Sequence, residues 1–293
     1  QYSSNRTVSN EWTLALSFQI KQMMKKYFIL IFYFLFFIKA YSQVSLSESE
    51  TKLYSMFEKL KTTDSKDSLL FINQQIEQEL NLALQNPFSF DYPFESLEFL
   101  GKIYSDDAQL RIYTWDIPFS DGTYTYGGIV QQKTGNIISS LKIKKSSYKP
   151  NIDKTIETDD WYGALYYKAF LVKHKKTSYY VLLGWAGNND LTTLKLIDAL
   201  SFNEKTGIIL GLPVFRKNGK EYSRVLFEYG NQNQMTLDYD DKKKQIVFDH
   251  LSPSSNKYEG IYSDYGPDFS YDSFQLNKKE WLFKEDVDVR NKE

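Results

Sequence analysis

The pattern of hydrophobic and polar positions divides the chain into three regions. An apolar run occupies Tyr27 to Ile38, two amphipathic stretches lie between Ser47 and Pro87, and segments of alternating polarity fill most of the remainder. Apolar side chains three and four residues apart indicate a helix, whereas a period of two indicates a strand. The pattern therefore predicts a helical pair followed by a mainly β region.

The two amphipathic stretches differ in how their ends are marked. Ser47 and Glu50 have the spacing of a capping box in the first, and Asn86-Pro87 ends the second because proline cannot continue a helix. Neither stripe sustains the three heptads of a coiled-coil arm. We therefore expect the pair to cover the sheet that follows. The stripes consist of Leu53, Met56, Phe57 and Leu60, and of Leu69, Ile72, Ile76, Leu80 and Leu84.

The region after residue 88 predicts strands joined by short turns. Asn218-Gly219 is a two-residue hairpin signal, and such short connections join antiparallel neighbours. Residues 179–185 are apolar on both faces, which indicates a central strand covered on one side by a second sheet or by the helices. The predicted fold class is mainly β: a long antiparallel meander, closed as a sandwich, a barrel or a propeller-like array. The expected strands are 101–105, 109–115, 124–132, 137–144, 164–174, 179–185, 194–203, 208–216, 221–229, 235–239, 244–249, 271–276 and 280–284.

The apolar run is 12 residues long, whereas a helix that crosses a bilayer core needs roughly 20. Met24-Lys25-Lys26 before it and Ala40-Tyr41-Ser42 after it fit a signal peptide cleaved before Gln43. A core helix and an uncleaved anchor are the alternatives. The predicted organisation is an extraneous or untranslated extension at 1–22, a signal peptide at 23–42, a helical segment at 43–87 and an antiparallel β domain at 88–293, with no transmembrane span after cleavage.

Composition narrows the range of functions. Five of the 36 basic and one of the 37 acidic residues precede Gln43, which leaves 31 basic against 36 acidic residues. A mildly acidic chain has no electrostatic footprint for nucleic acid. The absence of cysteine excludes disulfides, thiolate nucleophiles and cysteine metal sites. Aromatic residues are 17% of the chain, and most of them lie in the β region, where Tyr and Phe are favoured.

Established catalytic signatures are absent from the sequence. It has no G-x-S-x-G elbow, no phosphate-binding G-x-x-x-x-G-K or G-x-G-x-x-G and no H-E-x-x-H. The two histidines, His174 and His250, lie in separate expected strands. Asp249 and His250 would point to opposite faces of one strand, so they cannot pair directly.

The segment "GWAGNND" at 184–190 is the most unusual loop. Asn and Asp favour tight turns, but amide groups beside a Trp ring can also hold a sugar or another polar ligand. A Tyr-rich acidic segment at 259–274 could contribute to the same surface. The predicted ligand-binding residues are Trp185, Asn188, Asn189, Asp190, Tyr265 and Asp268.

The acidic segment also contains Asp264, Asp268 and Asp272. Carboxylates can hold Ca²⁺, and two facing carboxylates can hydrolyse a glycosidic bond. Their spacing of four residues differs from that of an EF-hand loop, and Gly266-Pro267 is typical of a structural turn. No cofactor is predicted, with Ca²⁺ at these three residues as the alternative.

Five segments resemble those of uncharacterised exported proteins from Bacteroidota-type bacteria, and the Ser42-Gln43 junction is also similar to theirs. The resemblance covers nearly all of the chain after the junction. It implies export to the periplasm, the cell envelope or beyond, and it carries no activity or site residue. The segments are "LRIYTWD" (110–116), "YYVLLGWAGNND" (179–190), "IVFDHLSP" (246–253), "YGPDFSYDSF" (265–274) and "EDVDVRN" (285–291).

No reaction or ligand follows from the sequence. The favoured hypothesis is an exported periplasmic or envelope protein that binds a ligand or partner, such as a glycan or an envelope protein, without catalysis. A hydrolase of glycans or another envelope polymer and a structural or assembly component of the envelope are the alternatives. Enzymatic activity is therefore unsettled, with the missing signatures against it.

Overall fold

The computed structural model describes residues 23–26, 46–143, 150–174, 177–203 and 207–289. The chain divides into two units, residues 1–49 and 50–293, and the described residues of the first unit are helical. The predicted extension at 1–22 lies outside the described residues, as does the predicted signal peptide apart from residues 23–26. No helix in the described part of the chain has the length and hydropathy needed to cross a membrane.

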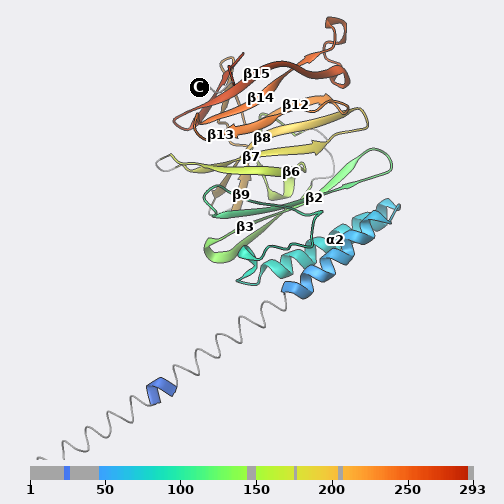
Figure 1. Cartoon of the computed structure of the whole chain (residues 1–293), viewed down its shortest axis with the longest axis vertical. Coiled ribbons are helices and arrows are strands. Elements are labelled where there is room, and N and C mark those ends of the chain that lie inside the picture. Colours follow the sequence, from blue (N-terminus) through green and yellow to red (C-terminus); the bar gives the residue numbers. More distant parts are fainter. Residues whose placement is uncertain (1–22, 27–45, 144–149, 175–176, 204–206, 290–293) are drawn as a thin grey trace, which may run out of the picture. The chain divides into compact units, whose positions relative to one another are not determined.

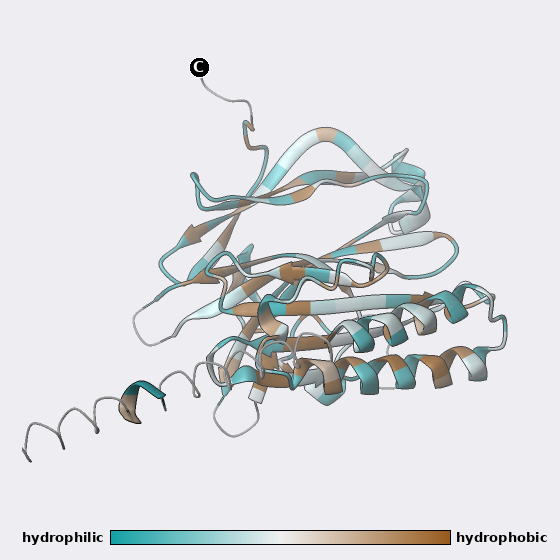
Figure 2. Cartoon of the chain, turned by 60° about the horizontal axis from the view of Figure 1, so that its bottom comes forward, coloured by the Kyte–Doolittle hydropathy of each residue, from teal (hydrophilic) through white to brown (hydrophobic). Residues whose placement is uncertain are grey.

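The second unit begins with the expected helical pair. Residues 50–61 are helical, and α2 (Lys66–Leu84) starts at the N-cap Ser65, whose hydroxyl accepts a hydrogen bond from Ser68 N. The buried positions of α2 include Leu69, Ile76, Leu80 and Leu84, which belong to the predicted stripe. Figure 2 shows hydrophobic and hydrophilic residues alternating along the helices. The 3.6-residue period therefore identified the face that packs.

Glu50 has a different role from the predicted capping box. Its carboxylate accepts hydrogen bonds from Tyr92 Oη at 2.6 Å and from Ser96 N at 2.7 Å. Ser47 and Glu50 have the spacing of a capping box, but the Glu50 carboxylate binds residues more than 40 positions away in the sequence. This contact ties the first helix to the chain that leads into the first strand.

The described strands form three sheets. The first has the order β1 (Gly101–Tyr104), β2 (Leu110–Pro118), β3 (Tyr124–Gln132), β4 (Ile137–Leu141). The second has the order β5 (Ile156–Glu157), β9 (Gly207–Leu210), β8 (Thr192–Asn203), β7 (Tyr179–Gly187), β6 (Leu165–Val172), with β12 (Arg224–Gly230) also on β8. The third has the order β11 (Lys220–Tyr222), β10 (Phe215–Lys217), β16 (Glu280–Lys284), β15 (Tyr265–Asn277), β14 (Gln245–Pro253), β13 (Leu237–Asp240). Short 3₁₀ helices are η1 (Ser89–Asp91), η2 (Thr134–Asn136), η3 (Thr158–Asp160), η4 (Asn256–Tyr258) and η5 (Tyr262–Asp264).

The middle sheet is covered on both faces, whereas the sequence predicts cover on one side of the strand at 179–185. Along β7, Tyr180 and Leu182 lie in a core shared with the first sheet, whereas Val181 and Leu183 lie in a core shared with the third. Figure 1 shows this order of layers, with α2 beside the first sheet. Successive strand residues point to opposite faces, so one strand contributes to two cores.

The mainly β, mostly antiparallel fold is confirmed, and the sheets are open, which removes the barrel from the three expected closures. The predicted hairpin at Asn218-Gly219 joins β10 to β11, and both residues have the positive φ that a type I′ turn requires.

Several strand boundaries differ from the expectation. The expected strand 208–216 divides into β9 and β10, because Gly211 at φ +82 and Pro213 interrupt it. The expected strand 221–229 divides into β11 and β12, and β15 starts at 265 rather than 271. The two-residue strand β5 and the parallel pairing of β10 with β16 were not predicted. Both depend on partners far away in the sequence, which local alternation does not encode.

Candidate functional site

A cleft opens where several elements of the first two sheets meet. Its volume is about 430 Å³. The β2–β3 hairpin, the start of α2, the turn before β6 and the β7–β8 hairpin all contribute to its walls. We call it the aromatic cleft. Its lining residues are Lys66, Leu70, Phe119, Thr123, Tyr124, Thr125, Tyr126, Ile143, Pro150, Tyr162, Gly163, Ala186, Gly187 and Leu194.

Two stacked tyrosines on β3 form one wall of the aromatic cleft. The ring centroids of Tyr124 and Tyr126 lie 6.3 Å apart at an interplanar angle of 21°, and Tyr126 Oη donates to the Gly187 carbonyl at 3.1 Å. A Cβ at Gly187 would lie 2.5 Å from the Tyr124 ring. A Cβ at Gly163, which has φ +87, would lie 2.3 Å from the Tyr126 ring. The rings can take these positions because glycine faces each of them.

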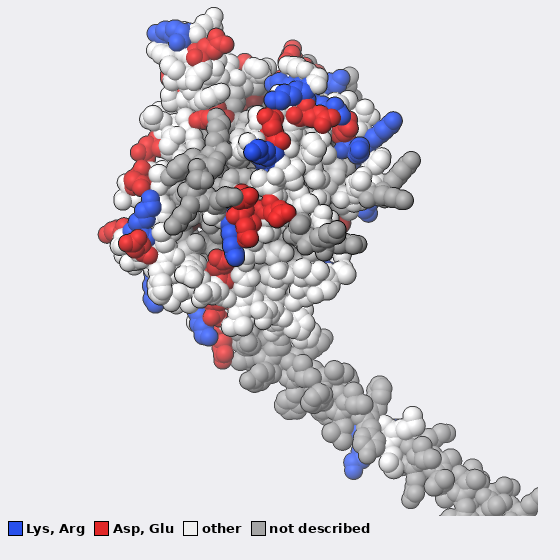
Figure 3. Space-filling view, turned by 180° about the vertical axis from the view of Figure 1, so that it is seen from behind, with Lys and Arg blue, Asp and Glu red and all other residues white. Residues whose placement is uncertain are grey.

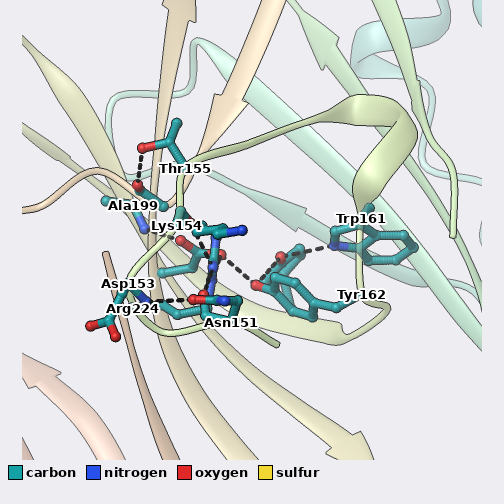
Figure 4. Close-up of polar contacts among 11 residues, drawn as sticks. Asn151, Asp153, Lys154, Thr155, Trp161, Tyr162, Ala199 and Arg224 are labelled. Atoms are coloured by element: carbon teal, nitrogen blue, oxygen red, sulfur yellow. Dashed lines mark hydrogen bonds and ion pairs between the residues drawn. The ribbon is translucent and has the colours of Figure 1, made fainter. Parts of the chain in front are cut away.

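Tyr162 connects the aromatic cleft to a buried polar network (Figure 4). Its hydroxyl donates to the Asp198 carboxylate and lies 3.0 Å from Tyr166 Oη. Tyr166 Oη in turn accepts from Trp161 Nε1 at 3.1 Å. Burial, and then the Asp198 carboxylate, raises the pKa of Tyr162 well above its usual value. Tyr162 is therefore a neutral hydrogen-bond donor whose ring is fixed beside the cleft.

The network centres on an ion pair between facing residues of β8 and β12. Arg224 Nε lies 3.2 Å from Asp198 Oδ2, and both side chains have 0% exposure. Asp198 also accepts from Ala199 N at 2.7 Å, and Arg224 Nη1 donates to the carbonyls of Asn151 and Lys154. Burial raises the pKa of Asp198, while Arg224 and the other donors act in the opposite direction. The three donors around the carboxylate favour its ionised form, in which it neutralises the buried guanidinium.

The charge at the rim of the aromatic cleft is also paired. Among its described lining residues Lys66 alone is charged, and its ammonium lies 2.9 Å from Asp121 Oδ2 and 4.3 Å from the Phe119 ring centroid. Hydrogen bonds from Thr123, followed by that from Lys66, lower the pKa of Asp121 to about 2. Figure 3 shows acidic and basic side chains intermixed on the face seen from behind Figure 1. The lining residues that the structure describes therefore carry no uncompensated charge.

The polar side chains of the predicted loop mainly close the β7–β8 hairpin. Asn188 Nδ2 donates to Thr192 Oγ1 at 2.7 Å and to Glu228 Oε1 at 3.1 Å. Asn189 Oδ1 accepts from the backbone of Leu191 and Thr192, and the Asp190 carbonyl accepts from Asn231. The loop contributes Ala186 and Gly187, rather than its amide side chains, to the cleft wall.

The structure separates the other predicted ligand residues. Trp185 lies on β7 of the second sheet, where it lines a different depression. Tyr265 and Asp268 lie on β15 of the third sheet. Tyr265 Oη accepts from Gly260 N, and Asp268 Oδ1 accepts from Ser270 N and Oγ. The six predicted residues thus do not line one cleft.

The three aspartates considered for Ca²⁺ are not brought together. Among the described residues no group of three or more Asp, Glu, His or Cys side chains converges as metal ligands. Asp272 instead pairs with His250, whose Nδ1 lies 2.8 Å from Asp272 Oδ2. The carboxylate of Asp249 accepts a hydrogen bond from Thr236 N. It does not pair with the neighbouring His250, and the alternation of side chains along a strand predicted this. The cross-strand partner of His250 was missed because the register of β14 on β15 contains a shift at that point.

Sequence reasoning also missed the tyrosines of the aromatic cleft and the buried ion pair. Tyr124, Tyr126 and Tyr162 follow the same alternation as core aromatics, so nothing local distinguishes them. The sequence did contain a signal for the ion pair. Asp198 points to the same face of its strand as Leu196 and Leu200, which lie in the core between the first two sheets. A charge at an inward strand position requires a buried partner.

Models of protein families, curated proteins and solved structures were compared with the chain, and none of them matches it.

Proposed function

We propose that this protein is an exported, non-catalytic binding protein of the periplasm or cell envelope that holds an uncharged sugar in the aromatic cleft. The observation that carries the proposal is the wall of Tyr124 and Tyr126, fixed by stacking and by glycines that face the two rings. Small-molecule sites are typically concave and aromatic, with a few polar groups that set orientation.

A sugar ring matches the chemistry of this lining. It has an apolar face of C–H groups that can lie on an aromatic ring, and a rim of hydroxyls that can bond to Thr123 and Thr125. Because Lys66 is neutralised by Asp121, a charged ligand would find no free counter-charge among the described lining residues. This favours an uncharged ligand.

The lining also favours binding over hydrolysis. Glycoside hydrolysis uses two carboxyl groups about 5–10 Å apart on either side of the bond that is cleaved. The described lining of the aromatic cleft contains no carboxylate. The proposed export is supported by the short apolar run at Tyr27–Ile38 with its basic and small-residue flanks.

Isothermal titration of the purified protein with neutral sugars tests the proposal. Glucose, N-acetylglucosamine and their β-1,4-linked oligomers are suitable probes. Tyr124→Ala should weaken binding at least tenfold, or about 1.4 kcal/mol. Tyr54→Ala removes a tyrosine that is 44% exposed in the first helix and serves as the matched control. Absence of binding by every sugar, or equal affinity of Tyr124→Ala and the native protein, would contradict the proposal.

A further inference from the structure

A second depression lies next to the aromatic cleft and has a volume of about 410 Å³. We call it the second cleft. Phe99 and Tyr167 on its rim are 48% and 40% exposed, and Trp185 beside them is half-buried. Its lining residues are Glu98, Phe99, Gly101, Ile103, Thr114, Leu165, Tyr166, Tyr167 and Trp185.

The two clefts share an aromatic partition. Tyr124 of the aromatic cleft meets Trp185 of the second cleft edge to face, with ring centroids 6.3 Å apart and an interplanar angle of 88°. Tyr162 of the aromatic cleft and Tyr166 of the second cleft lie with their hydroxyl oxygens 3.0 Å apart. Each contact joins a lining residue of one cleft to a lining residue of the other, so the clefts lie on either side of one layer of rings.

The second cleft also contains an unused polar group. Thr114 is 1% exposed, and its Oγ1 has no hydrogen-bond partner among the described residues. Oγ1 itself is buried, and it lies beside Gly101, where a Cβ would be 3.1 Å away. A buried hydroxyl without a partner is costly, and a ligand hydroxyl could supply one. A purely apolar occupant would leave that cost in place.

We propose that the second cleft is a second subsite for the same ligand, an inference that rests on the proposed function. The ligand is then an uncharged oligosaccharide that crosses the Tyr124–Trp185 partition and places a ring in each cleft. Aromatic surfaces on both sides, together with the Thr114 hydroxyl, match a chain of rings that carry hydroxyls.

The test is a chain-length series with the purified full-length protein. Glucose and N-acetylglucosamine, each as oligomers of one to six β-1,4-linked units, are titrated into the native protein. Affinity should rise at least tenfold from the monosaccharide to the longer chains. Trp185→Ala should remove this increase, and it should also lower monosaccharide affinity to the extent that the Trp185 ring supports Tyr124. Phe99→Ala, at a 48% exposed residue that does not line the aromatic cleft, should reduce the increase while it leaves monosaccharide affinity within twofold. Tyr54→Ala should change neither the increase nor the monosaccharide affinity.

The outcomes separate the two proposals. If no sugar of any length binds, the proposed function is wrong, and the subsite falls with it. If monosaccharides bind through Tyr124 but affinity does not grow with length, the function stands and the second subsite is refuted. A length increase that persists in both Trp185→Ala and Phe99→Ala would also refute it.

Discussion

We predict that Asp198→Asn lowers the free energy of unfolding by about 3–5 kcal/mol, the usual effect of removing one partner of a buried ion pair. Asp198 accepts from Arg224 Nε at 3.2 Å, from Tyr162 Oη and from Ala199 N at 2.7 Å. Asparagine keeps the shape but replaces one acceptor oxygen by an NH₂ group, and it leaves the buried guanidinium without a counter-charge. In a protein of this length that loss corresponds to a decrease in Tm of about 6–20 °C.

Urea unfolding followed by circular dichroism measures this loss. The double variant Asp198→Leu/Arg224→Met removes both charges and should recover part of the loss, because no buried charge is left unpaired. The recovery is incomplete because Ala199 N and the Asn151 and Lys154 carbonyls lose their partners. The matched control is Asp241→Asn. It breaks an ion pair with Lys244 at 2.6 Å whose side chains are 71% and 55% exposed. That variant should leave the urea midpoint unchanged.

Two results would refute the reasoning. A loss below about 1 kcal/mol for Asp198→Asn would place the pair in the range of exposed salt bridges. A double variant that is no more stable than the single one would mean that packing or the lost hydrogen bonds, rather than uncompensated charge, cause the loss.

Three further predictions concern the cleft and a hairpin. In an NMR titration the Asp121 carboxyl should show its midpoint at about 2, and Thr123→Val should raise it. Because folding lowers this pKa, the ionised Asp121 carboxylate stabilises the folded protein above the unfolded-state pKa, and this stabilisation is lost as the pH falls through about 2. A midpoint near 3.8 would contradict the hydrogen bonds described around Asp121. Gly187→Ala should displace the Tyr124 ring and weaken sugar binding in titration without a large change in Tm, and unchanged affinity would count against that wall. Gly219→Ala, at φ +76, should cost about 1 kcal/mol in urea unfolding, and a neutral result would contradict the strain.

The sequence predicted which faces of the strands are buried better than it predicted which strands pair with each other. The apolar residues on both faces of 179–185 identified a central strand, although cover was predicted on one side only, and Asn218-Gly219 identified a hairpin. Both signals are local. The parallel pairing of β10 with β16 joins segments more than 60 residues apart, and no short connection marks it. Such pairings follow from how the sheets stack, which a one-dimensional pattern does not contain.

The candidate site shows the same difference between local signals, which the sequence contains, and long-range contacts, which it does not. The loop at 184–190 was noticed for its Trp, Asn and Asp side chains, yet the Asn side chains close the hairpin, and the loop contributes the Ala186–Gly187 segment to the aromatic cleft. Trp185 points to the second cleft. The tyrosines of the cleft come from β3 and from the turn before β6. Their convergence depends on the packing of two sheets, so residue type alone could not identify them.

The buried ion pair links the register of a strand to the shape of the cleft. β8 pairs with β9 near its C-terminal end and with β12 along the rest, and Arg224 faces Asp198 in that pairing. A slip of β12 by one residue would move Arg224 to the opposite face, away from the carboxylate. The cost of an unpaired buried guanidinium opposes that slip. Because the same carboxylate accepts the Tyr162 hydroxyl, the interaction that opposes the slip also holds one side of the aromatic cleft in place.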